Sequence, residues 1–210
     1  VDPSTGKLTG VITDYVDLAE NCLQGQTLEF ELNGYDTRSE LLQALQDGKI
    51  DLIFHANQNP YFAETNGFAL SDTLLTLNMA AITAKDSFDE DKENLVAVEK
   101  EYFAMKAYLS YNYPQWKIME YETSDAAEDA MQKGEVDCIV RNSSRVADYL
   151  KNKKLSSVFL TKEADVSFAV QQGEPVLLSI LNKTLTSMPT TQFSGAVVSY
   201  NASARKVTAK

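Results

Sequence analysis

The apolar and polar positions of this chain follow helical spacing in some stretches and strand-like alternation in others. Residues 10–24 carry apolar side chains at helical spacing, and residues 28–32 (LEFEL) alternate as a half-buried strand does. More elements follow along the chain: strands are expected over 94–98 and 116–121, and helices over 102–111 and 175–188. Helices and strands mixed in this way predict an α/β protein.

One part of the chain occurs twice. Residues 44–54 (ALQDGKIDLIF) match residues 130–140 (AMQKGEVDCIV) at a constant offset of 86 residues, and Tyr35 and Thr37 match Tyr121 and Thr123 at the same offset. Each copy predicts a helix, a glycine that ends it, and a short apolar strand. The offset is too long for a solenoid repeat of about 20 to 50 residues. The repeat therefore predicts two α/β lobes of similar design.

Two β-rich apolar runs are long enough to pass from one lobe to the other. Residues 74–83 (LLTLNMAAIT) predict the first crossing and residues 159–170 the return. A hinge is expected within residues 76–83 and 161–166. The charged run over residues 85–93 (KDSFDEDKE) is expected to be a solvated loop.

Composition excludes several classes of protein. The chain has 210 residues with 44% hydrophobic and 23% charged residues, as in a globular protein, and its formal net charge is −11. Such a charge repels phosphate backbones, so nucleic acid is not an expected partner. Cys22 and Cys138 form no metal-binding or disulfide pattern and are expected to be small buried hydrophobes. No apolar run approaches the roughly 18 residues that cross a bilayer, so a secreted or anchored parent would contain this chain as a fragment.

The residues that most catalytic sites need are scarce. His55 is the only histidine, which excludes a site built on two histidines. The chain also has no GxSxG, GxxxxGK[ST] or GxGxxG motif. We therefore expect a protein that is not an enzyme and needs no metal or organic cofactor, with paired carboxylates as the catalytic arrangement left open.

Polar residues follow the apolar strand in both copies of the repeat. His55, Asn57 and Asn59 follow the first, and Arg141, Asn142 and Ser143 follow the second. Ligands of open α/β sheets bind outside the carboxyl ends of strands, so these residues predict a polar cleft between the lobes. Tyr35 and Tyr102, each just before a predicted helix, are the aromatic candidates.

Four segments together resemble the bacterial extracellular solute-binding proteins of family 3. They are residues 5–14 (TGKLTGVITD), 41–51 (LLQALQDGKID), 70–72 (LSD) and 134–137 (GEVD). The resemblance implies an α/β, two-lobe Venus-flytrap fold of the periplasmic-binding-protein type with two crossings between the lobes. Lobe 1 would comprise residues 1–80 plus 166–210, and lobe 2 residues 81–165.

The C-terminal part of the chain, residues 177–208, is similar to that of sensor domains on membrane signalling proteins such as diguanylate cyclases and histidine kinases. The resemblance implies an extracellular or periplasmic domain that closes on a small polar solute, an amino acid or a related molecule, and is anchored in the membrane through segments outside this chain. Three alternatives stay open: a substrate-binding subunit of an amino-acid-type ABC uptake transporter, a clamp that has lost its ligand and serves as a dimerisation or protein-contact module, and a periplasmic dehydratase with close carboxylates such as Glu64 and Glu99.

The chain departs from the family pattern at two ligand positions. Amino-acid binders of the family carry an arginine seven residues before the serine of the Ser-Asp pair, and this chain has Glu64 there. The family's acidic ligand for the α-ammonium falls on Asn142. We hypothesise that Arg141 substitutes for the missing arginine. The family's first strand is also missing, which predicts a gap or an intermolecular pairing in lobe 1.

The candidate ligand-binding residues are therefore Asp14, Tyr35, His55, Asn57, Asn59, Glu64, Glu99, Tyr102, Arg141, Asn142 and Ser143.

Overall fold

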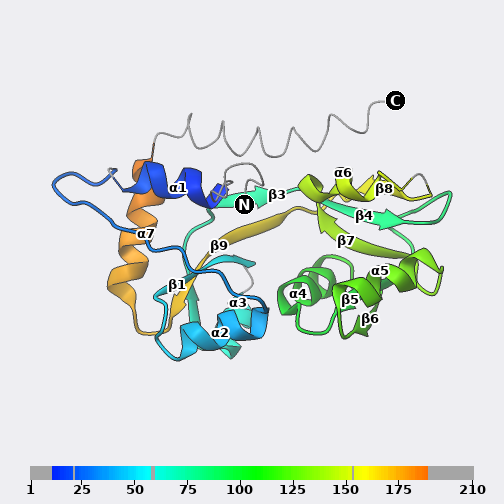
Figure 1. The fold of residues 1–210 in the computed structure, drawn as a ribbon, viewed down its shortest axis with the longest axis horizontal. Helices are drawn as coiled ribbons and strands as arrows, with labels where there is room; N and C mark the ends of the chain where they lie inside the picture. Colours follow the sequence, from blue (N-terminus) through cyan, green and yellow to red (C-terminus); the bar gives the residue numbers. More distant parts are fainter. Residues whose placement is uncertain (1–10, 21, 58–59, 153, 189–210) are drawn as a thin grey trace.

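The chain forms two lobes, each built around one β-sheet (Figure 1). The computed structural model describes residues 11–20, 22–57, 60–152 and 154–188. In the first sheet three strands pair antiparallel with β9 (Ala164–Gln171): β1 (Leu52–Asn57), β2 (Phe68–Leu70) and β3 (Leu75–Leu77). The second sheet has the order β6 (Lys117–Tyr121), β5 (Leu95–Glu99), β7 (Cys138–Asn142), β4 (Met79–Thr83) and β8 (Ser156–Phe159).

Helices cover both sheets. Around the first sheet lie α1 (Val11–Ala19), α2 (Arg38–Gln46), α3 (Pro60–Thr65) and α7 (Pro175–Ser187). Around the second lie α4 (Phe103–Asn112), α5 (Ser124–Gln132), a 3-10 turn (Ser143–Arg145) and α6 (Val146–Tyr149). None of the described helices is long and apolar enough to span a bilayer.

The two copies of the sequence repeat adopt the same local structure. The side chains of Thr37 and Thr123 accept the backbone N–H groups of Glu40 and Ala126, which caps α2 and α5. Gly48 and Gly134 follow these helices with φ of 67° and 75°, values that glycine adopts without a steric penalty. Helix, glycine and strand therefore recur in both lobes, as the repeat predicts.

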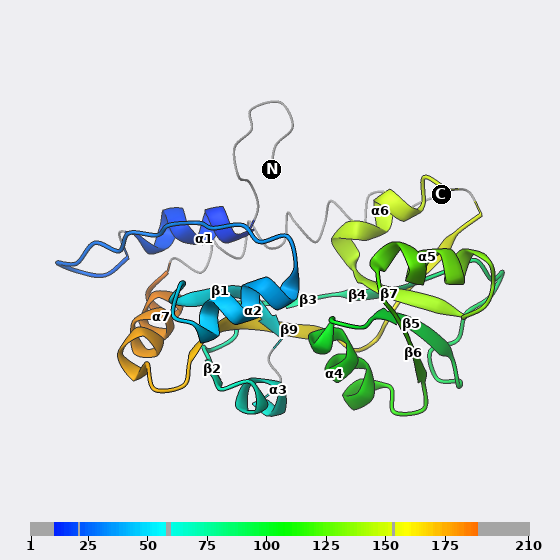
Figure 2. The same ribbon diagram turned by 60° about the horizontal axis from the view of Figure 1, so that its bottom comes forward.

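The predicted crossings are confirmed. β3 and β4 are separated by one residue and belong to the first and the second sheet, respectively. The chain returns where β8 of the second sheet is followed by β9 of the first. The two crossing segments run side by side, since Leu77 pairs with Ala164 on one side and Ala80 with Phe159 on the other. Figure 2 shows both segments passing between the lobes.

The strand expected over residues 28–32 is wrong. Within the described residues this segment joins neither sheet, although its Phe30 ring lies edge-on to Tyr15 at 5.9 Å between centroids. Alternating polar and apolar residues suit the two faces of a strand, but the backbone also needs a neighbouring strand with which to form hydrogen bonds. The short elements α3, β2, β8 and α6 have three to six residues each, too few to show a period in the sequence.

Strand β7 is apolar because both of its faces are covered. Cys138 and Val140 belong to a large cluster that also contains Tyr15 and Phe168, while Ile139 belongs to a cluster on the opposite face of the second sheet. Cys138 is buried and Cys22 half-buried, and both are free thiols. Burial raises the pKa of the Cys138 thiol, which stays protonated at neutral pH.

Asp137 ties strand β5 to the end of strand β4. Its side chain is 17% exposed, forms an ion pair with the Lys85 ammonium and accepts the Leu95 N–H at 2.6 Å. Burial alone would raise the pKa of this carboxyl, but the Lys85 ammonium and the Leu95 N–H outweigh it and hold the pKa below its usual range. A carboxyl with a lowered folded-state pKa stabilises the protein at neutral pH, and this stabilisation is lost as the pH falls below about 4.

We expect Asp137→Ala to lower the free energy of unfolding at pH 7 by about 1.5–3 kcal/mol, because a partly buried N–H loses a charged acceptor. Urea denaturation at pH 7 and at about pH 3 measures the effect. Asp51→Ala is the matched control, since Asp51 occupies the equivalent position of the repeat and is exposed. An Asp137→Ala deficit that does not shrink between pH 7 and pH 3 would contradict this role of the ionised carboxylate.

Candidate functional site

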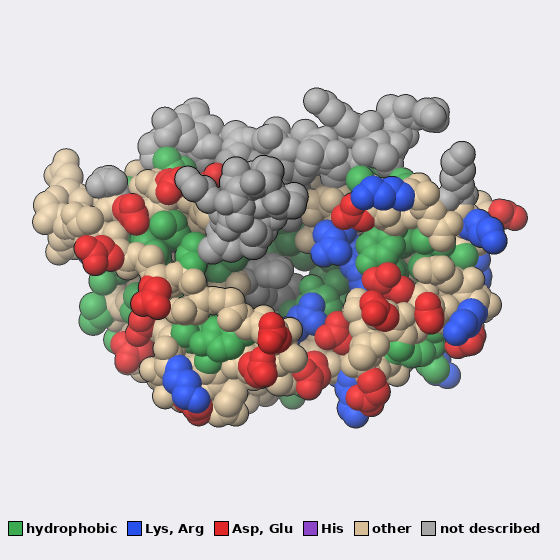
Figure 3. Space-filling view, in the orientation of Figure 1, with side chains coloured by type: hydrophobic (Ala, Val, Ile, Leu, Met, Phe, Trp, Pro, Cys, Tyr) green, Lys and Arg blue, Asp and Glu red, His purple; other side chains and the backbone are tan. Residues whose placement is uncertain are grey.

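A cavity of about 470 Å³ lies between the two lobes and is lined from both of them. Figure 3 shows the hollow that opens between the lobes on one face of the molecule. Among the described side chains, α2 and the first sheet contribute one charged group, Arg38, and otherwise apolar ones: Leu41, Leu42, Ile53, Phe54, Ala56, Leu77, Ala164 and Val166. Lobe 2 contributes most of the polar groups: Glu99, Glu101, Tyr102, Ser124, Glu128, Arg141, Asn142, Arg145 and Tyr149. Apart from Arg38, the polar groups of the cavity therefore come from lobe 2, which also contributes apolar side chains such as Val98 and Met105.

Arg38 reaches across the cavity from lobe 1 to lobe 2. Its Nη1 donates to Glu99 Oε1 at 2.9 Å, and its guanidinium carbon lies 3.6 Å from the centroid of the Tyr102 ring. The local sequence places these groups, because the Thr37 cap fixes Arg38 at the start of α2, whereas Glu99 ends β5 and Tyr102 precedes α4. An ion pair and a cation–π contact therefore join the two lobes at the cavity.

Arg141 lies within a hydrogen-bonded network of lobe 2. Its Nε donates to the Tyr149 hydroxyl at 2.9 Å, its Nη1 to the Val140 carbonyl at 3.0 Å, and its Nη2 to Ser124 Oγ at 3.0 Å and Glu128 Oε1 at 3.2 Å. Tyr149 in turn donates to Glu128, and burial raises the pKa of the Tyr149 hydroxyl. Four of the five guanidinium N–H groups of Arg141 thus already have protein acceptors.

The structure brings four of the candidate residues together at the cavity: Glu99, Tyr102, Arg141 and Asn142. Glu99 and Tyr102 stand beside Arg38, and Arg141 and Asn142 are consecutive residues of β7. The carboxamide oxygen of Asn142 accepts the Ser144 hydroxyl. The cavity wall of lobe 2 therefore holds all four.

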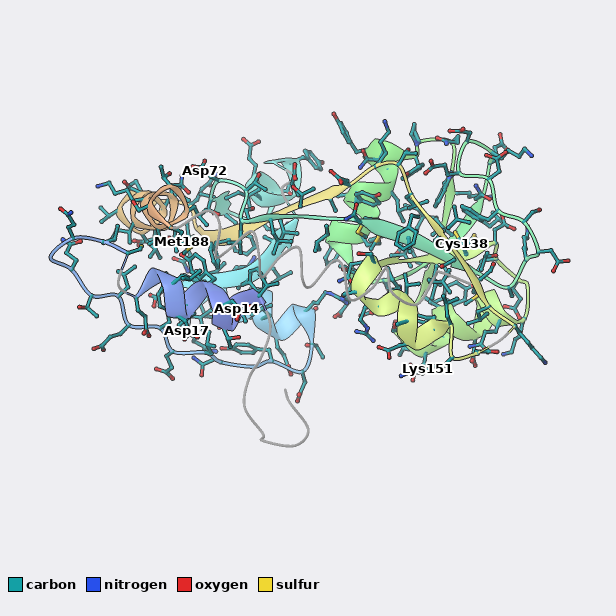
Figure 4. All side chains as sticks on the ribbon, turned by 90° about the horizontal axis from the view of Figure 1, so that it is seen from above. Asp14, Asp17, Asp72, Cys138, Lys151 and Met188 are labelled. Atoms are coloured by element: carbon teal, nitrogen blue, oxygen red, sulfur yellow. The ribbon has the colours of Figure 1, made fainter. Side chains whose placement is uncertain are left out.

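Four other candidates do not line the cavity. Asp14 is exposed on α1, as Figure 4 shows, and Glu64 is exposed on α3. Tyr35 lies 38% exposed in the segment before α2. Ser143 is buried, and its backbone N–H donates to the Asn78 carbonyl. The structure therefore does not place these four candidates at the cavity.

The remaining candidates follow the apolar part of the first repeat. His55 and Asn57 belong to strand β1, and their side chains lie outside the described part of the structure, as does Asn59 altogether. The expectation that His55, Asn57, Arg141 and Asn142 follow the strands is wrong, because they belong to β1 and β7. Both strands continue past their apolar residues because crossing strands run alongside them, so that Asn57 pairs with Val166 and Asn142 with Met79.

Sequence reasoning did not select several residues that line the cavity. Arg38 directly follows Thr37 of the repeat, but nothing local indicates that it contacts the other lobe. Ser124 and Glu128 are four residues apart and so share one face of α5, a spacing visible in the sequence. That this face meets Arg141 becomes evident only in the folded lobe.

The arrangement suits binding of a polar solute. Three arginines and three glutamates line the cavity, which therefore carries charges of both signs: Arg38, Arg141, Arg145, Glu99, Glu101 and Glu128. No group of three or more metal-ligating side chains occurs in the part of the chain that the structure describes.

Comparison with known proteins shows the fold and its relatives. The chain is 24% identical over 180 residues to the virulence sensor protein BvgS of Bordetella pertussis, an alignment that covers 81% of this chain and 14% of that protein. The crystal structure of the periplasmic VFT2 domain of B. pertussis BvgS matches with a TM-score of 0.73 and 23% identity over 94% of this chain and 86% of that one. The solute receptor for L-cysteine of Neisseria gonorrhoeae matches with a TM-score of 0.69 and 20% identity over 100% of this chain and 87% of that one. No protein-family model matches the chain.

These likenesses confirm the predicted fold, a two-lobe α/β Venus-flytrap domain of the periplasmic-binding-protein type. They also confirm the resemblance to periplasmic sensor domains and to solute-binding proteins. The chain spans 14% of the length of the curated sensor protein that it matches.

Proposed function

We propose that this chain is the periplasmic ligand-binding domain of a membrane signalling protein, and that its two lobes close on a small polar solute. The observation that carries the proposal is the cavity of about 470 Å³ lined from both lobes. A solute that touches both lobes binds the closed form more tightly than the open one and so shifts the equilibrium toward closure. Closure is then transmitted to the membrane through segments outside this chain.

The proposed division places lobe 1 at residues 1–80 plus 166–210 and lobe 2 at residues 81–165. The hinge lies in the paired crossing segments, where β3 passes into β4 and the chain returns into β9. The proposed ligand site is the cavity that Glu99, Tyr102, Arg141 and Asn142 line. The likeness to a solute receptor for L-cysteine supports a solute of amino-acid size, and the likeness to a sensor domain favours signalling over uptake.

We further propose that the domain binds its solute without converting it. Two of the glutamates at the cavity are engaged by cations or hydroxyl groups, Glu99 by Arg38 and Glu128 by Arg141 and Tyr149. Glu64, the carboxylate expected to oppose Glu99, is exposed on α3 and does not line the cavity. The carboxylate pair that was the catalytic alternative is therefore not formed, which supports binding without conversion.

A thermal-shift screen tests the proposal. The panel contains amino acids, organic acids, sugars, polyamines and short peptides, and a ligand at about 100 times its Kd should stabilise the native state by about 2.7 kcal/mol. Leu42→Trp is the control, because this half-buried side chain lines the cavity and its enlargement should abolish a shift that comes from the cavity. A panel without any shift would instead favour a protein-contact module.

A further inference from the structure

We propose that Arg38 binds the anionic group of the ligand, and that the Glu99 carboxylate marks the position that a ligand carboxylate takes. The ligand class is then a small solute that carries at least one carboxylate. This inference rests on the proposed function of the cavity and adds to it the chemistry of the ligand. Three arginines line the cavity, and their contacts differ.

Arg38 has free donors at the cavity. Its side chain is 42% exposed and, within the described part of the chain, makes one hydrogen bond, from Nη1 to Glu99 Oε1. A guanidinium has five N–H donors, so four of them are left for a ligand. Two neighbouring N–H donors of a guanidinium can bind both oxygens of one carboxylate. Glu99 uses only one of its oxygens, so this paired binding mode of Arg38 is open to a ligand.

Tyr102 orients the guanidinium of Arg38. The guanidinium carbon lies 3.6 Å from the ring centroid, within the distance of a stacked cation–π contact. A stacked guanidinium keeps its N–H groups at the rim of the stack, where they can donate to an anion. Because Arg38 belongs to lobe 1 and Tyr102 to lobe 2, an anion held here is fixed where the lobes meet.

The other two arginines at the cavity fit this role less well. Arg141 is 17% exposed, and four of its N–H groups already donate to Tyr149, Val140, Ser124 and Glu128. A ligand that took these donors would leave partly buried acceptors unpaired, which costs free energy. Arg145 is 61% exposed and faces Asp148 at 3.9 Å, and no cation–π contact with a described aromatic ring orients it. Arg38 alone combines free donors with a fixed orientation.

Glu99 is a carboxylate that a ligand can displace. Its side chain is 26% exposed and its contact with Arg38 uses one oxygen, so the pair resembles a surface ion pair, which contributes little to stability. A ligand carboxylate that binds Arg38 through both oxygens makes one more charge-assisted hydrogen bond than Glu99 does. Glu99 therefore competes with anionic ligands and lowers their apparent affinity.

The test is isothermal titration calorimetry with four purified proteins: the original chain, Arg38→Gln, Glu99→Gln and Arg145→Gln. The probes are acetate, succinate and L-glutamate as carboxylates, and glycerol and putrescine as uncharged and cationic compounds. We expect at least one carboxylate to bind, to lose about tenfold or more in affinity in Arg38→Gln, and to gain severalfold in Glu99→Gln. Arg145→Gln is the matched control, because it removes a cavity charge of the same sign without touching Tyr102 or Glu99.

The outcomes separate this inference from the proposed function. Carboxylate binding that is unchanged in Arg38→Gln, or equally weakened in Arg145→Gln, overturns the role of Arg38 and leaves the binding function in place. Binding of only glycerol or putrescine has the same consequence. Binding of no probe to any of the four proteins, Glu99→Gln included, overturns the assignment of carboxylates as the ligand class, and the broader thermal-shift screen then decides the proposed function. Thermal denaturation of each variant confirms that it is folded.

Discussion

Replacing Tyr15 by alanine is expected to lower the free energy of unfolding by about 3–5 kcal/mol, the range found when a large buried aromatic side chain is removed. The Tyr15 side chain is fully buried between α1, α7 and the first sheet. Its ring lies 4.7 Å from that of Phe168 and 5.9 Å from that of Phe30, measured between centroids. Chemical denaturation followed by circular dichroism measures the loss.

A variant that lacks only the Tyr15 hydroxyl separates the contribution of packing from that of hydrogen bonding. Thr184 gives its one hydroxyl proton to the Leu181 carbonyl at 2.6 Å, so Tyr15 must be the donor in its 2.6 Å hydrogen bond to Thr184. Burial raises the pKa of Tyr15 to about 12, so the donor keeps its proton at neutral pH. Tyr15→Phe removes this hydrogen bond and keeps the packing, and should cost about 1 kcal/mol. A Tyr15→Ala protein no less stable than Tyr15→Phe would contradict the packing argument.

The second large effect is expected in lobe 2, where Trp116→Ala should also lower the free energy of unfolding by about 3–5 kcal/mol. Trp116 is 6% exposed, stacks on Tyr113 with centroids 4.5 Å apart, and meets the edge of Phe88 at 5.5 Å. Its indole N–H donates to the Glu90 carbonyl at 2.9 Å. The substitution therefore removes both a core side chain and one of the groups that anchor the charged segment at 85–93.

The charged segment should become easier to cleave in this variant. Glu90 is also held by the Tyr113 hydroxyl, which donates to its Oε2 at 2.9 Å, and by the Thr161 N–H at 3.0 Å. We expect trypsin to cleave at Lys85 or Lys92 several times faster in Trp116→Ala than in the original chain, because local opening then costs less. Trp116→Phe is the control, since it keeps most of the packing and loses only the indole donor, and should cost about 1 kcal/mol. Circular dichroism is the suitable probe, because Trp116 is the only tryptophan. Equal cleavage in all three proteins would contradict the anchoring role.

The exposure of this charged segment agrees only in part with the prediction from its sequence. Its charges predict a solvated loop, and residues 85–87 are indeed exposed. Phe88 and Glu90, however, are half-buried and packed or hydrogen-bonded to the aromatic cluster around Trp116. Charge density is a property of the whole run, whereas each side chain is placed by its own neighbours in the fold.

What the sequence by itself determined is local. The repeat predicts the helix, glycine and strand of each lobe because a cap, a positive φ and an apolar strand each depend on a few neighbouring residues. The two crossings follow from β-rich runs that are too long for one short strand. The absence of catalytic motifs is also a property of the sequence.

Only the tertiary structure decided which side chains share the cavity. Arg38 meets Glu99, 61 residues away, because the two lobes dock with the start of α2 against the end of β5. Arg141, the arginine that the sequence singled out, turns instead to Ser124, Glu128 and Tyr149 of its own lobe. The physical reason is that a side chain's partner is set by which groups the folded backbone brings within about 3 Å, and in this cavity those groups come from segments that no local pattern connects.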